Sequence, residues 1–244
     1  MAEIICCGSS SEGNAYILKC DNEALLVELG VPFREIRRAL NNDISMVKAA
    51  LVTHVHSDHS EYIPQAQQKG ISVYSCQEVA DKYKRVNVIK VGQEEKERFG
   101  GFFVQPVHVP HNVECYSFLI THEEFGRLWF ITDCREFTLT RKHAPNVNHI
   151  FIECNYAESV IIDRMCETNK GNESRSEHHM ELSKTIKALK NNYSPDLMTV
   201  GLLHLSNGNS DEKMFRQRVI DELGFDNVVV MDKGLTIPLQ LSEF

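Results

Sequence analysis

Short apolar runs rich in strand-forming residues alternate with amphipathic segments along the chain, and this alternation limits the folds that the sequence can adopt. The first half predicts a helix that begins at Pro32 and strands at 4–7, 15–20, 24–29, 49–53, 71–74, 86–91, 102–109, 117–121, 127–132 and 149–153. The second half predicts helices at 160–167, 180–191 and 211–223, and strands at 197–203, 227–231 and 235–239. Strands grouped with helices in two similar halves predict an α/β protein whose two sheets pack together with helices outside, a four-layer α/β/β/α sandwich.

The length and composition favour a single folded domain. The chain has 244 residues, of which 42% are hydrophobic and 25% charged, and it contains no internal repeat and no Pro/Gly-rich linker. We therefore predict one domain over residues 1–244 and interpret the polar stretch 167–177 as a surface loop or lid.

The sequence also predicts a cytoplasmic protein that does not enter a membrane. No apolar run reaches the roughly 18 residues that span a bilayer. The first residues lack the basic region of a signal peptide. The eight cysteines form no Cys-x-x-Cys pair, which is typical of a reduced compartment rather than of a disulfide framework.

Four side chains of the kind that bind metals fall within six residues, directly after the strand predicted at 49–53. They are His54, His56, Asp58 and His59. His54 and His56 can point the same way because side chains two apart share a face of an extended chain, while the other two follow in the loop. Random placement would give this pattern roughly once in a thousand chains of such composition. The segment therefore predicts a metal site that could serve two ions.

The spacing His-x-His-x-Asp-His resembles the signature of the metallo-β-lactamase fold superfamily, which has the four-layer sandwich. Within it, the chain is most similar to the YycJ/WalJ-like hydrolases, a bacterial and phage-borne branch related to metallo-nucleases. The resemblance runs nearly end to end, and it also rests on the segments GSSSEGN (8–14), LVELGVPFREIRRAL (26–40), ECNY (153–156) and LHLSNGNS (203–210).

The resemblance implies the remaining metal ligands one at a time. The third-motif histidine matches His111, with His108 as the competing position, the bridging aspartate matches Asp133, and the last histidine matches His204. The first ion would then be held by His54, His56 and His111 and the second by Asp58, His59 and His204, with Asp133 bridging. Imidazole and carboxylate ligands suit zinc or manganese, and iron is a further possibility, so we expect two divalent ions.

A histidine near 178–179 is also implied by the resemblance, and His179 fits it better than His178. It could serve as a general acid, a phosphate ligand or a partner of a metal ligand. We expect Asp58, Asp133 and His179 to be the catalytic residues, and Glu153 and Asn155 could orient ligands. The chain departs from the pattern of the branch at Asn112, where Asp is usual, and this difference concerns the substrate rather than the metal site.

These features predict a metal-dependent hydrolase of the phosphodiesterase and nuclease class. We expect water between the two ions to attack phosphorus in line, and the branch resemblance favours a DNA exonuclease. The formal net charge of −8 argues against a broad nucleic-acid surface, and it fits a small phosphodiester such as a cyclic nucleotide or dinucleotide somewhat better. An iron redox enzyme on the same fold is a further alternative, and a homodimer that completes the pocket is plausible.

Overall fold

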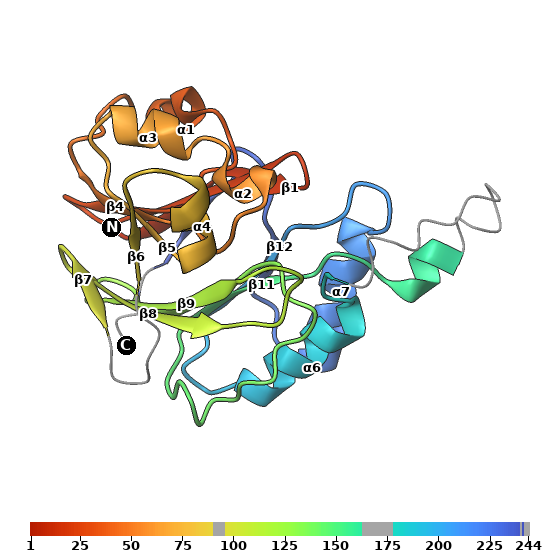
Figure 1. Cartoon of the computed structure of the whole chain (residues 1–244). Coiled ribbons are helices and arrows are strands. Elements are labelled where there is room, and N and C mark those ends of the chain that lie inside the picture. Colours follow the sequence, from red (N-terminus) through yellow and green to blue (C-terminus); the bar gives the residue numbers. More distant parts are fainter. Residues whose placement is uncertain (90–95, 163–177, 240, 242–244) are drawn as a thin grey trace.

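Two seven-stranded sheets lie against each other in the computed structural model, which describes residues 1–89, 96–162, 178–239 and 241 (Figure 1). The first sheet has the order β14-β1-β2-β3-β4-β5-β6 and consists of β1 (Glu3–Ser10), β2 (Gly13–Lys19), β3 (Ala24–Val27), β4 (Val47–Leu51), β5 (Val73–Ser75), β6 (Val86–Val88) and β14 (Thr236–Pro238). The second has the order β13-β12-β11-β10-β9-β8-β7 and consists of β7 (Glu97–Phe99), β8 (Phe102–His108), β9 (Tyr116–His122), β10 (Gly126–Ile131), β11 (His149–Glu153), β12 (Thr199–Leu203) and β13 (Val228–Val230).

Helices cover the outer face of each sheet (Figure 1). The first sheet carries α1 (Phe33–Ala39), α3 (Ile63–Gln68) and α4 (Gln77–Lys82), with the single turn α2 (Ser57–Ser60) beside β2. The second sheet carries α6 (Leu182–Asn192) and α7 (Glu212–Leu223), which contact β11 and β13. The predicted four-layer α/β/β/α sandwich is therefore confirmed.

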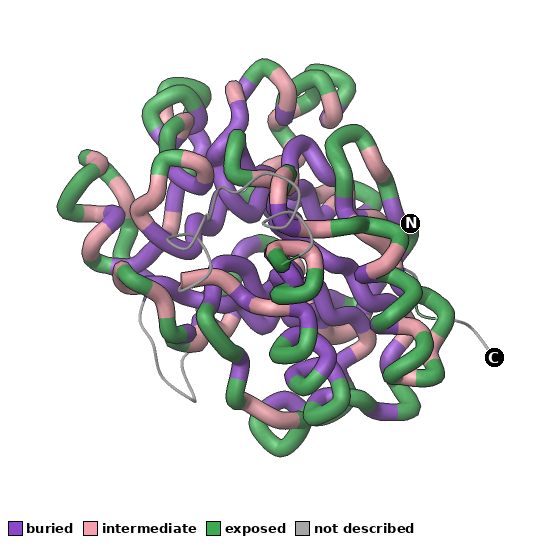
Figure 2. The backbone as a smooth tube through the Cα atoms, turned by 90° about the vertical axis from the view of Figure 1, so that its right-hand side faces the viewer, coloured by how far each residue is buried: buried purple, intermediate pink, exposed green. Residues whose placement is uncertain are grey.

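The buried core lies between the sheets and beneath the helices. One apolar cluster joins residues of both sheets, among them Ile17, Phe118 and Phe130, and a second lies between the second sheet and its helices, around Trp129 and Phe215. Figure 2 shows the backbone buried in the central layers and exposed in the outer loops. Within the described part of the chain, no helix is long and apolar enough to cross a membrane.

Several elements differ from the sequence predictions. The last strand, β14, pairs with β1 at the edge of the first sheet rather than with its sequence neighbours in the second half. The short helices α2, α3 and α4 and the strand β7 were not predicted, because elements of three to six residues show too little hydrophobic periodicity. The predicted helix 160–167 extends past the described residues, and the predicted lid at 167–177 lies outside them.

The strand directions explain why polar side chains gather at one edge of the sandwich. Strands β10, β11 and β12 run parallel to one another, as do β3, β4 and β5. Because the carboxyl ends of parallel strands meet at the same edge, the residues that follow each of these strands lie close together.

Candidate metal centre

Each predicted metal ligand follows a strand or lies in a short turn at this edge. His54 comes after β4, Asp133 after β10 and His204 after β12, while Asp58 and His59 lie in α2. His56 precedes α2, and His111 lies between β8 and β9. Asp133 and His204 have φ angles of 37° and 53°. Residues other than glycine rarely adopt these left-handed conformations, and functional sites are one of the places where they cluster.

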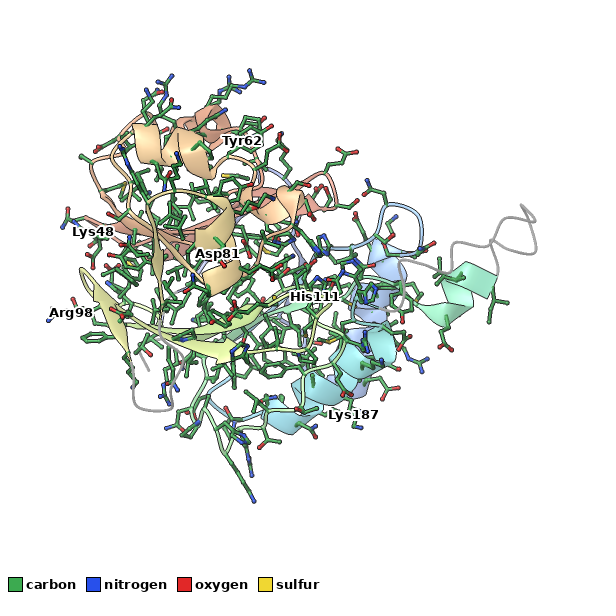
Figure 3. The ribbon with its side chains drawn as sticks, in the orientation of Figure 1. Lys48, Tyr62, Asp81, Arg98, His111 and Lys187 are labelled. Carbon is green, nitrogen blue, oxygen red and sulfur yellow. The ribbon has the colours of Figure 1, made fainter. Side chains whose placement is uncertain are left out.

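The structure brings all seven residues together in two groups that share Asp133. One group contains His54, His56, His111 and Asp133, and the other contains Asp58, His59, Asp133 and His204. The ligand atoms of each group all lie within 4.8 Å of one another. Figure 3 shows His111 well away from Lys48 and Arg98, which lie at the left of the view.

Asp133 presents one carboxylate oxygen to each group. Its Oδ2 lies 3.8 Å from His54 Nε2 and 4.0 Å from His111 Nε2. Its Oδ1 lies 3.3 Å from His59 Nε2 and 3.2 Å from His204 Nδ1. A buried carboxylate in this position can serve cations on both sides.

The electrostatics of the first group leave its imidazoles free to bind a cation. Burial is the main cause that lowers the pKa of His54, His56 and His111 below the ordinary histidine value. A neutral imidazole keeps a lone pair on one ring nitrogen. These three histidines are therefore in the state that metal binding requires.

The carboxylates of the second group draw positive charge to its histidines, because they raise the pKa of both His59 and His204. Burial would raise the pKa of Asp58, but the neighbouring imidazoles of His204 and His59 outweigh it and hold the pKa well below the usual range. Burial would likewise lower the pKa of His204, but the carboxylates of Asp133, Asp58 and Glu153 raise it to about 10. Buried His204 Nε2 has no hydrogen-bond partner of good geometry, although Asp58 Oδ2 lies 3.4 Å away. These carboxylates attract positive charge, and they lie beside a buried ring nitrogen that lacks a good hydrogen-bond partner. A bound divalent cation would satisfy both.

A buried carboxylate and hydroxyl contact His54 and His59. Thr53 Oγ1 donates to Glu28 Oε1 at 2.6 Å, and it lies 2.8 Å from His54 Nδ1. His54 Nδ1 can donate to that hydroxyl, so its Nε2 lone pair faces Asp133. Glu28 also lies 3.3 Å from His59 Nδ1. Asn14 Nδ2 lies 3.1 Å from His59 Nε2.

A small cavity of about 180 Å³ opens onto the two groups, and it is lined by Ser11, His56, Asp58, Asp133, Asn155, His179, His204 and Ser206. His179 Nδ1 lies 2.6 Å from Glu153 Oε1 and 3.7 Å from Asp133 Oδ2. Glu153 also accepts hydrogen bonds from the backbone N–H groups of Cys134 and Met180. His179 is therefore held at the wall of the cavity beside the groups.

Comparison with known proteins agrees with this arrangement. Residues 26–200 match the family described as the beta-lactamase superfamily domain. The chain belongs to the beta-lactamase superfamily. No curated protein matches the chain by sequence.

Solved structures show that the superfamily fold extends over almost the whole chain. The metallo-beta-lactamase fold protein YhfI from Bacillus subtilis has a TM-score of 0.73 at 15% identity, and the match covers 98% of this chain and 100% of that one. Zn(2+)-bound PqqB from Methylobacterium extorquens has a TM-score of 0.72 at 15% identity, covering 97% and 100%. A diphosphatase from the PhnP family has a TM-score of 0.65 at 14% identity, covering 99% and 100%. At these identities the likeness is one of fold.

The structure separates the competing histidines of this superfamily member. His108 stacks edge-on against Tyr116 and belongs to neither group, whereas His111 belongs to the first. His179 reaches the cavity, whereas His178 contributes its backbone oxygen, which accepts from His111 Nδ1 at 3.0 Å. Asn155 donates to His204 O at 2.8 Å, so it touches the second group as expected.

Sequence reasoning missed three residues that support the site. Asn14, Glu28 and Thr53 contact the histidines but were not singled out. Asn14 and Glu28 lie in motifs that carried the superfamily resemblance, and Glu28 is a charged residue directly after an apolar strand. The position of Glu28 directly after the strand was the available signal in the sequence. The structure buries its carboxylate fully, and a buried carboxylate requires partners.

Proposed function

We propose that this superfamily member is a dinuclear metal-dependent hydrolase that cleaves phosphodiester bonds. Among its candidate substrates we favour DNA, which it would cleave from the ends as an exonuclease. The observation that carries the proposal is the position of Asp133, which faces a His-rich group with one oxygen and an Asp/His group with the other. The motifs similar to the YycJ/WalJ-like branch support a nuclease, and a diphosphatase is among proteins of similar fold.

The seven grouped residues would hold two ions, zinc or manganese, with Asp133 shared between them. When bound there, divalent ions supply an activated water and positive charge for phosphoryl oxygens. Asp58 and Asp133 would keep the ions in place. Glu28 and Thr53 would hold the histidine rings in the orientation that exposes their lone pairs.

His179 is proposed to give a proton to the leaving oxygen. Its Nδ1 is tied to Glu153 at 2.6 Å, which leaves Nε2 to face other groups. The ring lines the cavity, and its side chain is 20% exposed. A histidine held by a carboxylate on one nitrogen can carry the proton on the other.

A second candidate substrate is a small phosphodiester, such as a cyclic nucleotide or a dinucleotide. A larger cavity of about 680 Å³ adjoins the metal site through Ser206, and its lining includes Glu12, Glu35, Glu212 and Asp232. Lys233 in the same cavity is paired with Glu35. These carboxylates would repel the successive phosphates of a nucleic acid more strongly than one compact phosphodiester.

Asp58→Asn tests the proposal directly. Wild type loaded with Mn²⁺ or Zn²⁺ should release mononucleotides or a ladder from one end of labelled single-stranded or duplex DNA. Asp58→Asn should reduce that rate by at least about a hundredfold, because it removes a charged ligand of the activating ion. His108→Asn is the matched control and should keep the activity, because His108 belongs to neither group.

The outcomes separate the candidates. Intact DNA with cleaved cyclic nucleotide or dinucleotide would favour the small phosphodiester. A loaded wild type that cleaves none of these substrates, or an Asp58→Asn protein as active as wild type, would contradict the proposed function. Protein that is coloured and contains iron as isolated would favour the redox alternative.

A further inference from the structure

A second cluster of metal-binding side chains lies where a turn of one sheet meets a turn of the other. Cys20 and Glu23 belong to the turn between β2 and β3, while His122 ends β9 and Glu124 lies in the turn before β10. Cys20, His122 and Glu124 each offer one ligand atom, and these atoms all lie within 4.8 Å of one another. The residues that meet here are about a hundred positions apart in the sequence, so only the packing of the two sheets brings them together.

The sulfur and the imidazole already have the spacing of ligands to one ion. Cys20 Sγ lies 3.2 Å from His122 Nδ1. Tetrahedral zinc bonds to sulfur and nitrogen would place these atoms about 3.5 Å apart. Both residues are buried, with 1% and 4% of their surface exposed, whereas the side chain of Glu124 is 25% exposed. The Glu124 carboxylate lies 3.3 Å from the N-terminal ammonium of Met1 and accepts from the Asp21 N–H, so an ion that reaches the buried pair would take the place of that ammonium.

The ring of His122 is held so that its Nδ1 lone pair lies near the sulfur and near the Glu124 backbone N–H, which donates to it at 3.2 Å. Its Nε2 lies 2.9 Å from Glu23 Oε1, and that oxygen also accepts from the Gly101 N–H at 2.8 Å. A Cβ at residue 101 would come within 2.7 Å of His122 Nε2, so glycine is needed for this approach. A histidine that donates one N–H to a carboxylate and presents its other nitrogen is the usual arrangement beside a protein-bound metal.

This cluster is separate from the candidate metal centre. Asn14, at the start of β2, contacts His59, whereas Cys20 follows the other end of the same strand. Six steps of extended chain from Asn14 to Cys20 span about 20 Å. A side chain at Gly100 would meet both Glu23 and Lys48, and Figure 3 shows Lys48 at the left of the view, well away from His111.

We propose that Cys20, His122 and Glu124 bind one zinc ion that joins the two sheets at the edge opposite the candidate metal centre. A cysteine sulfur and an imidazole favour zinc over manganese or magnesium. The Cys20 thiol gives up its proton to solvent when the ion binds, and water fills the fourth position. This proposal does not depend on the proposed hydrolase activity.

The cluster around Cys20 is not suited to catalysis with Cys20 as a nucleophile. Cys20 Sγ, His122 and Glu23 are arranged in the order of a nucleophile, base and orienting carboxylate. However, the sulfur is almost fully buried, so a substrate could not reach it. Burial, followed by the nearby carboxylates of Glu124 and Glu23, also raises the pKa of this thiol, which disfavours a free thiolate.

Metal content and cobalt spectra of the full chain test the proposal. Zinc-loaded wild type, freed of loosely bound metal, should contain one more zinc per chain than Cys20→Ser. Cobalt-loaded wild type should show the near-ultraviolet charge-transfer band of a cobalt–thiolate bond, and Cys20→Ser should lose it. Cys115→Ser is the matched control, because Cys115 Sγ lies 3.7 Å from His54 Nδ1 and is the thiol beside the candidate metal centre.

Each outcome decides for or against the site. Equal zinc content in wild type and Cys20→Ser would overturn the proposal, and so would loss of the cobalt band in Cys115→Ser but not in Cys20→Ser. If Cys20→Ser fails to fold, Glu124→Gln replaces it, because this partly exposed side chain can change without disturbing the core. That variant should bind the extra zinc at least tenfold more weakly than wild type, and unchanged affinity would contradict the site.

Discussion

At the scale of single residues, the site depends on side chains that touch the histidines rather than on the histidines alone. Glu28 and Thr53 are both fully buried, and they form a chain of contacts that ends at His54 Nδ1. Because the Thr53 hydroxyl donates to Glu28, its oxygen accepts from His54, and the proton of the His54 ring is therefore on Nδ1. The other nitrogen then presents its lone pair to the first group.

Thr53→Val should therefore weaken metal binding by about tenfold or more, since it removes this hydroxyl and keeps the shape of the side chain. The measurement is the zinc dissociation constant in competition with a chelator. Thr53→Ser keeps the hydroxyl and should bind zinc as wild type does. Equal affinity in the valine and serine variants would show that the hydroxyl does not orient His54.

At the scale of elements, the single turn α2 places two of the proposed ligands. The segment after β3 holds this turn closely, because Leu29 N–H donates to His59 O at 2.8 Å. Gly30 lies directly against the backbone of Asp58, and a Cβ there would overlap with the Asp58 carbonyl group. The turn can approach β3 this closely because residue 30 has no side chain.

Gly30→Ala should lower the free energy of unfolding by about 1–3 kcal/mol, because backbone must shift to make room. The same shift should move Asp58 and His59 and reduce metal-dependent hydrolysis. Gly70→Ala is the control for turnover: a Cβ there meets no atom within 4 Å, although its φ of 80° makes alanine lower the stability there as well. Turnover should separate the two variants, and equal losses of turnover would refute the role of Gly30.

At the scale of the whole molecule, a buried histidine links stability to pH. His149 begins β11 with only 1% of its surface exposed, and neither ring nitrogen has a hydrogen-bond partner of good geometry among the described residues. Burial is the main cause that lowers its pKa from 6.5 to about 4. The folded protein therefore holds this ring neutral in mildly acidic solution.

The sign of the effect follows from that lowered pKa. Above pH 6.5 the ring is neutral in both states, whereas between pH 6.5 and 4 the unfolded chain binds a proton that the folded chain does not. Wild type should thus lose about 3 kcal/mol of unfolding free energy through His149 over this window. The free energy of unfolding is measured with denaturant for wild type and for His149→Leu. The value for wild type minus the value for His149→Leu should fall by that amount from pH 7 to pH 4. Parallel pH curves for the two proteins would refute the assignment.

Much of the fold and part of the site could be predicted from the sequence. The strand and helix pattern predicted the four layers, because the periodicity of long elements is local and survives in the folded chain. His54, His56, Asp58 and His59 were evident because all four lie in one short segment. His111, Asp133 and His204 were reached only through the superfamily resemblance, since each alone looks like an ordinary polar residue at the end of a strand.

The sequence by itself determined which of the longer segments form strands and helices and where one cluster of metal-binding side chains begins. The tertiary structure alone decided that Asp133 faces two groups, that Glu28 and Thr53 orient His54, and that β14 joins the first sheet. It also decided that Cys20 meets His122 across the sandwich. The physical reason is that residues far apart in sequence become neighbours only when apolar burial packs the two sheets together, and no local spacing encodes that contact.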